Sequence, residues 1–575
     1  MQSRPITANP SQIMVEQLAA SGVKYVFYNS GSREARFFDT LASHNDINGI
    51  LALHEGSVTA MAGGYTQIDT EVAVMVVHLG AGLAQAMGQL INIWAGSLPV
   101  VVITFAGDTG SFGDIVSLDL SHNFGPTSIA APVTKANWTV IEPEGLPAAL
   151  DRAIRVAKTP PVGPVHIAVY DRLLGDQQIS TNILEGGHHE FRSGYPSDSD
   201  LEQVAVALHE AERPLIYVGD GVWKSGAEAA VTEIAERFGA AVASGFGDMR
   251  SVPIKHPQHA GRIDMAAAAI SPDLVVSIGA RHGGAGLASD FAPFANANKT
   301  IAIGSDVDYL KNMPGLDLAI LADERRFAER LLELSQSETT PERYDERRDK
   351  MREQANALRS TRRAALQSAP AESGKVRPYQ LITALDSELE RIGGGIVTTE
   401  QFAVPQDTHG GEGDPGNNVY IRAAGGSEGY GVGGAIGAKL GAPDTPVVGL
   451  VGDGSVYYAD SGMWTAVHHR IPLLYVVPNN GAYGIVANAF GGANANMKET
   501  GEYSGVVLDG MDPAKIAEGF GVEASTVTDE STVAESIANG LDIVQRENRP
   551  YLLNVHLPLG LPEGGRRADP YQLKS

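Results

Sequence analysis

The chain has 575 residues, a formal net charge of −25, 43% hydrophobic residues and 19% charged residues. This length predicts about three domains of roughly 150 residues each, and the composition is typical of a folded protein with large apolar cores. The acidic excess argues against binding to nucleic acid or to an anionic membrane surface. Because the chain has no cysteine, disulfides, thiolate metal sites and cysteine nucleophiles are excluded.

The N-terminal segment MQSRPITANPSQ lacks the apolar core of a signal peptide. The stretch 72–107 contains no Asp, Glu, Lys or Arg, but His78, several glycines, Asn92 and Pro99 interrupt it. A lipid-spanning helix tolerates such interruptions poorly. We therefore expect a buried strand, a glycine turn, a helix and a second buried strand here, in a cytoplasmic protein.

Short β-branched runs alternate with helical patterns in the first third of the chain. The runs are VKYVFY (23–28), VAVMVV (72–77), VVVITF (100–105) and VHIAVY (165–170). Buried strands separated by helices predict a parallel, doubly wound sheet. The polar stretch 175–200, rich in Gly and Ser, then indicates a linker.

Two further series of the same kind follow. The second contains PLIYVGDG (214–221), DLVVSIGAR (273–281) and TIAIGSD (300–306), and the third contains GGIVTTE (394–400), VVGLVGDG (447–454), LLYVVPNN (473–480) and YLLNVHLP (551–558). Between them, residues 334–375 are strongly charged and predict an exposed helix plus a second linker. The predicted fold class is α/β, with three doubly wound parallel-sheet domains, of which the first and third are alike. The predicted bounds are 1–185, 196–340 and 376–562, followed by a tail over 563–575.

Asp453 ends an apolar strand in a Gly-Asp-Gly turn, where its carboxylate projects past the carboxyl edge of the predicted sheet. Glycines in such a turn let backbone N–H groups approach phosphate oxygens. After a further helix and strand comes Asn479-Asn480. An aspartate, an amide oxygen and a backbone carbonyl suit a hard cation such as Mg²⁺, which takes its other ligands from phosphate and water. Gly-Asp-Gly alone is a common turn, but joined to Asn-Asn it predicts a metal–diphosphate site.

This combination of GDG and NN is the pattern of thiamine diphosphate enzymes. The run AIGAKLGAPDTPVVGLVGDGS (435–455) resembles the acetolactate synthase and benzoylformate decarboxylase branch of that family. The resemblance implies that Asp453 and the side chain of Asn480 ligate Mg²⁺, with the carbonyl of Ala482 as the third protein ligand. It also implies a cofactor-binding set that comprises Asp453, Gly454, Ser455, Asn480, Tyr483, Gly484 and Gln401.

Glu55 lies just after a short apolar strand and at the start of a helix, in LALHEGSVTAMAGGYTQ (51–67). A carboxylate at a helix N-terminus is stabilised as the anion, which alone explains a glutamate here. The segment also resembles the family's activating-glutamate region, in which an acid precedes a helix ending in Gly-Tyr. The resemblance implies that Glu55 hydrogen-bonds the cofactor's aminopyrimidine and promotes its active tautomer. In such enzymes this glutamate and the metal site come from different subunits, so a homodimer or homotetramer is expected.

Two other positions of the first series are candidates for substrate contact. His78 precedes LGAGLAQAMG, and the segment resembles a benzoylformate decarboxylase region with an active-site histidine at this place. A histidine at a strand end is often only hydrogen-bonded within the protein, but this one is predicted at the ligand-binding edge of the sheet. Ser32, in NSGSREARFF, matches the active-site serine of the same branch, with a turn-capping serine as the alternative.

The region AAGGSEGYGVGGAIG (423–437) aligns with the family loop that supports the bent conformation of the cofactor. A bulky apolar side chain usually lies beneath the two cofactor rings, and Glu428 takes that place here unless the register shifts by one. Because an unpaired buried carboxylate is costly, we expect Glu428 to be paired or protonated. Gln401 and the neighbouring Glu400 lie at a strand end where family members contact the cofactor.

The second series contains two strand ends of a nucleotide-binding type, IGAR (278–281) and IGSDVD (303–308). Arg281 would bind a diphosphate and Asp306 a ribose. No full GxGxxG motif accompanies them, so both residues are equally explained as surface caps. Family members use this domain for FAD, for ADP or for no ligand.

The tail LPLGLPEGGRRADPYQLKS (557–575) extends beyond the usual end of the fold and carries Arg566, Arg567 and Lys574. By composition these are incidental charges of a solvated tail. However, oxalyl-CoA decarboxylase and the 2-hydroxyacyl-CoA lyases, which the chain resembles, close a basic C-terminal segment over coenzyme A. The resemblance implies that Arg566 and Arg567 cover an acyl-CoA substrate.

The segment after the metal motif, GAYGIVANAFGGANANMKE (481–499), is expected to line the substrate pocket. It has no ionisable group between Tyr483 and Lys498. Ala493, assigned to the substrate site, and Ala495 stand where a polar residue is expected. Either the pocket is naturally apolar, or such a residue has been replaced.

The whole chain most resembles an actinobacterial 2-hydroxyacyl-CoA lyase of the 2-hydroxyisobutyryl-CoA type. That resemblance implies reversible cleavage of a 2-hydroxyacyl-CoA to formyl-CoA and a ketone or aldehyde. The alternative is a 2-keto-acid decarboxylase or carboligase resembling benzoylformate decarboxylase or acetolactate synthase, favoured by MWTAVHHRIPLLYVVPNNGAYG (463–484) and His78. Glu428 and the bare stretch 485–497 suggest a third hypothesis, a cofactor-binding protein without turnover.

Overall fold

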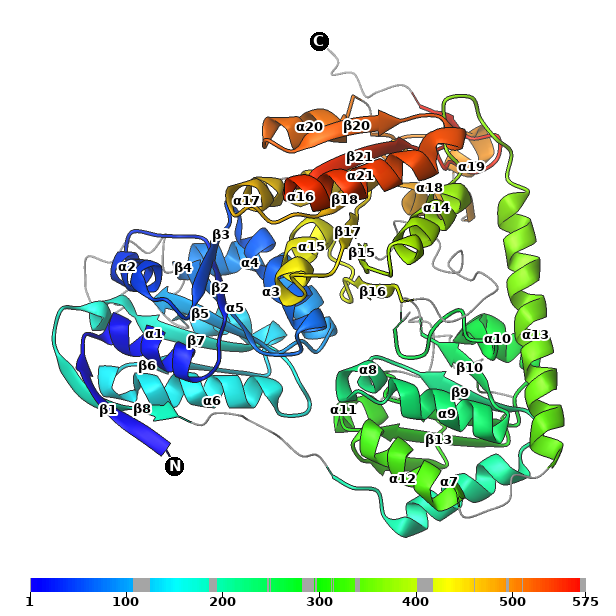
Figure 1. Cartoon of the computed structure of the whole chain (residues 1–575), viewed down its shortest axis with the longest axis horizontal. Coiled ribbons are helices and arrows are strands. Elements are labelled where there is room, and N and C mark those ends of the chain that lie inside the picture. Colours follow the sequence, from blue (N-terminus) through cyan, green and yellow to red (C-terminus); the bar gives the residue numbers. More distant parts are fainter. Residues whose placement is uncertain are drawn as a thin grey trace. The chain divides into compact units, whose positions relative to one another are not determined.

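The structure is a computed structural model and forms two compact units (Figure 1). The first unit comprises Met1–His189, Ala371–Val404 and Ile421–Ser575, and the second, here the central unit, comprises Glu190–Pro370 and Pro405–Tyr420. The structure describes residues 2–106, 125–185, 194–245, 248, 250–281, 294, 297–311, 313, 315–336, 342–400, 417–459, 461–492, 496–508 and 510–568.

The N-terminal part of the first unit is a six-stranded sheet of order β3-β2-β4-β5-β7-β6, in which all the paired strands are parallel. Its strands are β2 (Tyr25–Tyr28), β3 (Asn48–Leu51), β4 (Ala73–His78), β5 (Val100–Ala106), β6 (Ala136–Val140) and β7 (Val165–Tyr170). Its helices are α1 (Pro10–Ala20), α2 (Ala35–Ser43), α3 (Glu55–Ile68), α4 (Leu79–Ala95), α5 (Gly125–Ala130) and α6 (Leu146–Lys158). β4, α4 and β5 confirm the strand–helix–strand prediction for residues 72–107.

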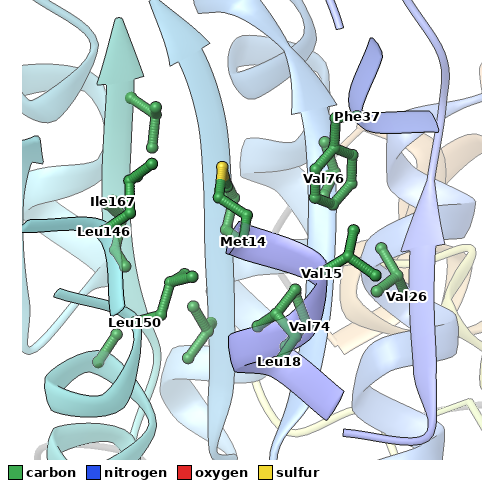
Figure 2. Packing of buried hydrophobic residues seen from close by; sticks show 14 of the residues in the cluster. Met14, Val15, Leu18, Val26, Phe37, Val74, Val76, Leu146, Leu150 and Ile167 are labelled. Atoms are coloured by element: carbon green, nitrogen blue, oxygen red, sulfur yellow. The ribbon is translucent and has the colours of Figure 1, made fainter. Parts of the chain in front are cut away.

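Helix α1 shows how the sequence sets these elements. Asn9 and Gln12 form a reciprocal capping box, and Pro10 occupies the first turn, where its missing N–H costs nothing. The apolar face of α1 then packs on the sheet together with α6, as Figure 2 shows. The buried side chains labelled there are Met14, Val15, Leu18, Val26, Phe37, Val74, Val76, Leu146, Leu150 and Ile167. Apolar burial of this extent is the main stabilising contribution to the domain.

The C-terminal part of the first unit is a second six-stranded sheet, of order β16-β15-β17-β18-β21-β20. Its strands are β15 (Ile396–Thr399), β16 (Val419–Arg422), β17 (Val447–Leu450), β18 (Leu474–Asn479), β20 (Glu523–Val527) and β21 (Tyr551–His556). Its helices are α14 (Pro378–Arg391), α15 (Tyr430–Gly441), α16 (Asp453–Ala459), α17 (Gly462–His468), α18 (Gly484–Gly492), α19 (Asn496–Thr500), α20 (Pro513–Gly519) and α21 (Val533–Glu547). Counted along the chain, its strands follow the same spatial order as those of the N-terminal sheet, which confirms that the two domains are alike.

Helices α3 and α15 join these two domains within the first unit. A Cβ at Gly64 would lie 2.0 Å from the carbonyl oxygen of Gly434, and one at Gly437 would lie 1.9 Å from the carbonyl oxygen of Met61. Both distances are far below contact, so only glycine allows the two backbones to approach this closely.

The central unit contains the third six-stranded sheet, of order β11-β10-β9-β12-β13-β14. Its strands are β9 (Pro214–Val218), β10 (Ala241–Ser244), β11 (His259–Arg262), β12 (Leu274–Ile278), β13 (Lys299–Gly304) and β14 (Leu318–Leu321). Its helices are α7 (Asp198–Glu210), α8 (Gly221–Ser225), α9 (Glu228–Phe238), α10 (Ile263–Ile270), α11 (Val307–Leu310), α12 (Glu324–Gln336) and α13 (Glu342–Gln367). The three-domain α/β prediction is therefore confirmed.

The structure differs from the sequence prediction in two connecting segments. The stretch 175–200, predicted as a linker, contains β8 (Ile179–Glu185), which pairs antiparallel with β1 (Gln2–Ala8). The charged stretch 334–375, predicted as an exposed helix and a linker, contains α13, which buries Tyr344, Arg347 and Met351 against the central unit. In the described part of the chain, no helix has both the length and the apolarity needed to cross a membrane.

Candidate active site

The carboxyl edge of the C-terminal sheet places Asp453 beside Gly481. β15 and β17 are neighbours at the point where the strand order reverses, because β16 lies on the outer side of β15 and β18 on the other side of β17. Ligands of open α/β sheets bind at the carboxyl ends of strands at such a switch point. Asp453 begins α16, separated by two residues from the end of β17, is buried, and accepts a hydrogen bond of 2.7 Å from the backbone N–H of Gly481. Burial raises the pKa of its carboxyl group above the ordinary value.

The two asparagines that follow have different environments. Asn479 donates to Asn554 Oδ1 over 3.0 Å and accepts from the Gly481 N–H over 3.2 Å, so its side chain is used within the protein. The Asn480 amide makes a longer contact of 3.4 Å, from Nδ2 to the carbonyl oxygen of Leu559. Because amide oxygen and nitrogen point to opposite sides, this contact directs the oxygen of Asn480 away from Leu559.

Short backbone contacts fix the segment that carries Ala482. Tyr483 N–H donates to the Val506 carbonyl over 2.7 Å, and Leu508 N–H donates to the Gly481 carbonyl over 2.8 Å. A buried carboxylate, an amide oxygen and a rigid carbonyl at one sheet edge are oxygen donors of the kind that Mg²⁺ selects. These residues therefore fit a small cation bound with a diphosphate.

Gly454 packs closely against Tyr483, which in turn contacts Tyr458. A Cβ at Gly454 would lie 2.7 Å from the ring of Tyr483, so a larger residue does not fit there. The Tyr483 hydroxyl lies 2.9 Å from that of Tyr458, and this hydrogen bond, with burial, raises the pKa of Tyr483 to about 12. Gly484 begins α18 immediately afterwards.

Glu428 lies in the loop between β16 and α15, and this loop is held by α4 of the N-terminal domain. Asn92 is buried, donates to the Ser427 carbonyl over 2.7 Å, and accepts from the N–H groups of Gly425 and Ser427. Gln89 donates to the Glu428 carbonyl over 2.8 Å. These bonds fix the backbone on both sides of the Glu428 side chain. The sequence analysis identified neither Gln89 nor Asn92 as part of the site.

The Glu428 carboxylate accepts a hydrogen bond of 3.1 Å from the Ser455 hydroxyl. The second carboxyl group at this place belongs to Glu400, which directly follows β15 and is 3% exposed. Burial and the neighbouring Glu428 raise the pKa of Glu400 well above its ordinary value. Both effects favour the protonated form of Glu400.

Glu55 begins α3 at the carboxyl end of β3 and is mostly buried. Its carboxylate faces the first turn of α4, where a Cβ at Gly82 would lie 2.9 Å from Oε1. Glycine at this position leaves the carboxylate room for a further partner. Helix α4 thus contacts Glu55 at one end and the Glu428 loop at the other.

His78 ends β4, beside the carboxyl end of β2, which is the equivalent edge position in the N-terminal sheet. Its Nδ1 lies 2.8 Å from Glu34 Oε1, and Glu34 is fully buried. Ser32, two residues before Glu34, is exposed at the same edge. The sequence analysis did not identify Glu34. Its only indication was the position of this acid, two residues after Ser32 and just before α2.

The central unit places Arg281 and Asp306 at the ends of the neighbouring strands β12 and β13. Arg281 stacks on the Tyr309 ring and donates to its hydroxyl. Asp306 caps α11 by accepting from the Asp308 N–H over 2.8 Å. Each side chain therefore has a structural role, and the nucleotide site stays a prediction.

The tail residues Arg566 and Arg567 form β22, which pairs in parallel with β19 (Glu502–Tyr503). Arg566 also makes an exposed ion pair of 2.6 Å with Glu502. These arginines are thus part of a small sheet next to the segment that follows the metal motif, rather than of a free tail. Gln401 and Ala493, both assigned from the sequence, lie outside the described residues, as do Ala495 and Lys574.

The structure thus forms two groups of assigned residues at equivalent sheet edges of the first unit. The first group comprises Asp453, Asn480, Ala482, Ser455 and Glu428, and the second comprises Ser32, His78 and Glu55 with the newly found Glu34. Oxygen donors for a cation occupy one edge, and a buried acid in contact with a partly exposed histidine occupies the other.

Comparison with known proteins assigns each domain to a family model. Residues 9–125 match the N-terminal binding domain of thiamine pyrophosphate enzymes, 201–331 the central domain and 413–555 the C-terminal binding domain. Benzoylformate decarboxylase of Pseudomonas aeruginosa is 27% identical, over 94% of this chain and 97% of its own length. A probable acetolactate synthase large subunit of Methanocaldococcus jannaschii is 25% identical, over 97% and 94%.

Solved structures agree in fold. The thiamine diphosphate-dependent 4-hydroxybenzoylformate decarboxylase of Rhodococcus jostii has a TM-score of 0.77 at 24% identity, covering 96% of this chain and 99% of that one. Benzoylformate decarboxylase of Polynucleobacter necessarius has a TM-score of 0.79 at 21% identity, covering 96% and 99%. With all three domain models matched in order along one chain, the protein belongs to the thiamine pyrophosphate (thiamine diphosphate) enzyme family.

Proposed function

We propose that the protein catalyses thiamine diphosphate-dependent cleavage or formation of the carbon–carbon bond next to the carbonyl group of a 2-keto acid, as a decarboxylase or carboligase. The observation that carries this proposal is the contact of the buried Glu34 with the partly exposed His78, at the same sheet edge as the exposed Ser32 and as Glu55. The relatives named benzoylformate decarboxylase and acetolactate synthase, whose chains align over nearly their full length, support the same class of reaction.

Each residue has a distinct proposed role. Asp453, Asn480 and the Ala482 carbonyl hold Mg²⁺, and Ser455 lies near the diphosphate. When bound, thiamine diphosphate supplies the electron sink for the bond that breaks. Glu55 provides a fixed carboxylate for the aminopyrimidine.

The substrate would be positioned by the N-terminal domain. If Glu34 takes the hydrogen bond of Nδ1–H, the Nε2 atom of His78 is left as the proton acceptor toward the substrate. Ser32 offers a hydroxyl group to the substrate carboxylate. In this proposal two subunits complete each site, so a dimer is the smallest active assembly.

The direct test is turnover of a panel of 2-keto acids, including pyruvate and benzoylformate, with thiamine diphosphate and Mg²⁺, measured as CO₂ release. The Glu55→Gln variant should bind the cofactor but slow exchange of its thiazolium C2 proton by about 10²-fold or more. Glu535→Gln, an exposed acid on α21, serves as the control. Fast exchange that does not depend on Glu55, with no turnover of any 2-keto acid, would refute the proposal.

A second candidate is the 2-hydroxyacyl-CoA lyase that the tail suggests. What favours it is the position of β22 on β19, with the Leu559 carbonyl contacting the Asn480 amide. The ion pair of Arg566 with Glu502 weakens it, because that charge already has a partner. Removal of residues 564–575 separates the two: the lyase loses formyl-CoA release from 2-hydroxyisobutyryl-CoA, whereas a 2-keto-acid enzyme keeps its CO₂ release.

A further inference from the structure

Two acids, Glu400 and Glu428, meet at the carboxyl edge of the C-terminal sheet between β15 and β17. Glu400 follows β15, and its Oε1 accepts a 2.5 Å hydrogen bond from the backbone N–H of Gly431. Its other oxygen, Oε2, is buried and has no hydrogen-bond partner among the described residues. Glu428 is the charged group that interacts most strongly with this carboxyl group. The buried oxygen therefore belongs to a carboxyl group whose pKa burial and the neighbouring Glu428 both raise, which favours its protonated form.

Hydrogen bonds from the protein hold the Glu400–Glu428 pair on one side, and the other side is accessible. The Glu428 backbone is fixed by Gln89, and its carboxylate is held by the Ser455 hydroxyl. Glu400 is 3% exposed, whereas Glu428 is partly exposed, so the free side of the pair is that of Glu428. Ser455 is two residues from Asp453, which places this free side next to the proposed diphosphate site.

The charge of the pair is not balanced within the described part of the protein. Neither glutamate forms a salt bridge with a described Lys, Arg or His side chain, and Tyr430, the other titratable group facing Glu400, is neutral. A negative charge that a bound ligand would cover is costly unless a cation accompanies it. A ligand bound at this edge would thus be favoured if it brought a positive charge.

We propose that the Glu400–Glu428 pair presents one negative charge to the cationic thiazolium ring of thiamine diphosphate and selects for that charge. Glu400 holds the proton and Glu428 carries the charge. The proposal rests on the proposed function, because it assumes that thiamine diphosphate binds at this edge.

The test compares thiamine diphosphate with an analogue in which carbon replaces the thiazolium nitrogen, so that the ring is neutral. Dissociation constants of both compounds are measured calorimetrically with Mg²⁺ for the wild type, Glu428→Gln, Glu428→Leu, Glu400→Gln and the surface control Glu535→Gln. The readout is the ratio of the two constants, which needs no turnover and cancels any common loss of affinity.

Both Glu428 variants should shift this ratio toward the neutral analogue by about tenfold or more, since they remove a charge near the ring. Glu400→Gln should keep the wild-type ratio, because its amide is neutral, as the protonated acid is, and its oxygen can still accept from the Gly431 N–H. The control should also keep it.

Three results would overturn the inference. An unchanged ratio in both Glu428 variants removes the role of the charge, and a shift in Glu400→Gln as large as that in Glu428→Gln removes the assignment of the proton to Glu400. Both results leave the proposed function intact. If the wild type binds neither compound with Mg²⁺, the proposed function fails and the inference fails with it.

Discussion

The Nδ1 atom of His78 lies 2.8 Å from Oε1 and 2.9 Å from Oε2 of Glu34, a carboxylate with no exposed surface. A Cβ at Gly31 would lie 1.9 Å from the same nitrogen, so the turn before α2 closes directly over this contact. The contact fixes both the orientation of the ring and the nitrogen that carries the proton. In the proposed reaction Glu34 would thus act through His78 as a positioning residue.

Replacing Glu34 with Gln should lower kcat by roughly 10²- to 10⁴-fold, the usual range for a disturbed general acid–base group. In a His78→Ala background the same replacement should have no further effect, because both changes remove one function. The check is the double-mutant cycle in kcat, with far-UV circular dichroism to confirm folding. Additive losses in the double variant would show that Glu34 acts independently of His78.

The neighbouring asparagines of the metal motif should respond differently to alanine. Asn480→Ala should weaken Mg²⁺-dependent binding of thiamine diphosphate by roughly 100-fold, since loss even of an outer partner of a metal ligand costs 10- to 100-fold. Asn479→Ala removes the bonds to Asn554 and Gly481 and should mainly lower stability. Calorimetric titration and thermal denaturation measure the two effects, and the reverse pattern would assign the metal to Asn479.

The contact between α3 and α15 gives a steric prediction. Gly437→Ala places a methyl group 1.9 Å from the Met61 carbonyl oxygen, and we expect a loss of at least about 1–3 kcal/mol in the free energy of unfolding. Gly519→Ala in α20 is the matched control, because nothing lies within 4 Å of the added carbon. It should be neutral or stabilise by up to about 1 kcal/mol. Urea denaturation measures both, and equal stability of the two variants would contradict the close packing.

Glu324 in the central unit predicts a pH dependence of stability. It is 3% exposed, and burial raises its pKa from 4.5 to about 7, although Ser305 donates to it. Because the folded pKa lies above the unfolded one, its contribution is complete below pH 4.5 and is lost as the pH rises through about 7. The difference in pKa corresponds to roughly 3 kcal/mol as an upper value.

Glu324→Gln should therefore be more stable than the wild type at pH 8, by up to about 3 kcal/mol, with a smaller difference at pH 5. Glu329→Gln, an exposed acid on the same helix that pairs with Arg325, should keep the wild-type pH dependence. Denaturant unfolding at the two pH values gives both differences. A Glu324→Gln advantage that does not change with pH would contradict the raised pKa. Asp248, whose pKa burial raises to about 6, contributes equally to both proteins and cancels in the comparison.

The sequence predicted the fold well where its patterns are strong. Runs such as VAVMVV and VVVITF are buried on both faces and became β4 and β5, because only central strands of a covered sheet bury every side chain. Prediction failed for β8, whose polar residues form a two-stranded edge with β1. Backbone hydrogen bonds between segments distant in the chain stabilise such a strand pair. Residues of almost any type can make these bonds, so the local hydrophobicity pattern does not predict them.

The sequence by itself determined the family and placed the candidate site residues at strand ends, because Asp453, Asn480, Glu55 and His78 each follow an apolar run that leads to a sheet edge. Only the tertiary structure decided their partners. Glu34 at His78, and α4 under the Glu428 loop, depend on contacts between segments up to 339 residues apart. Contacts of this kind form when the fold brings distant segments together. They cannot be predicted from residue type or from spacing along the chain.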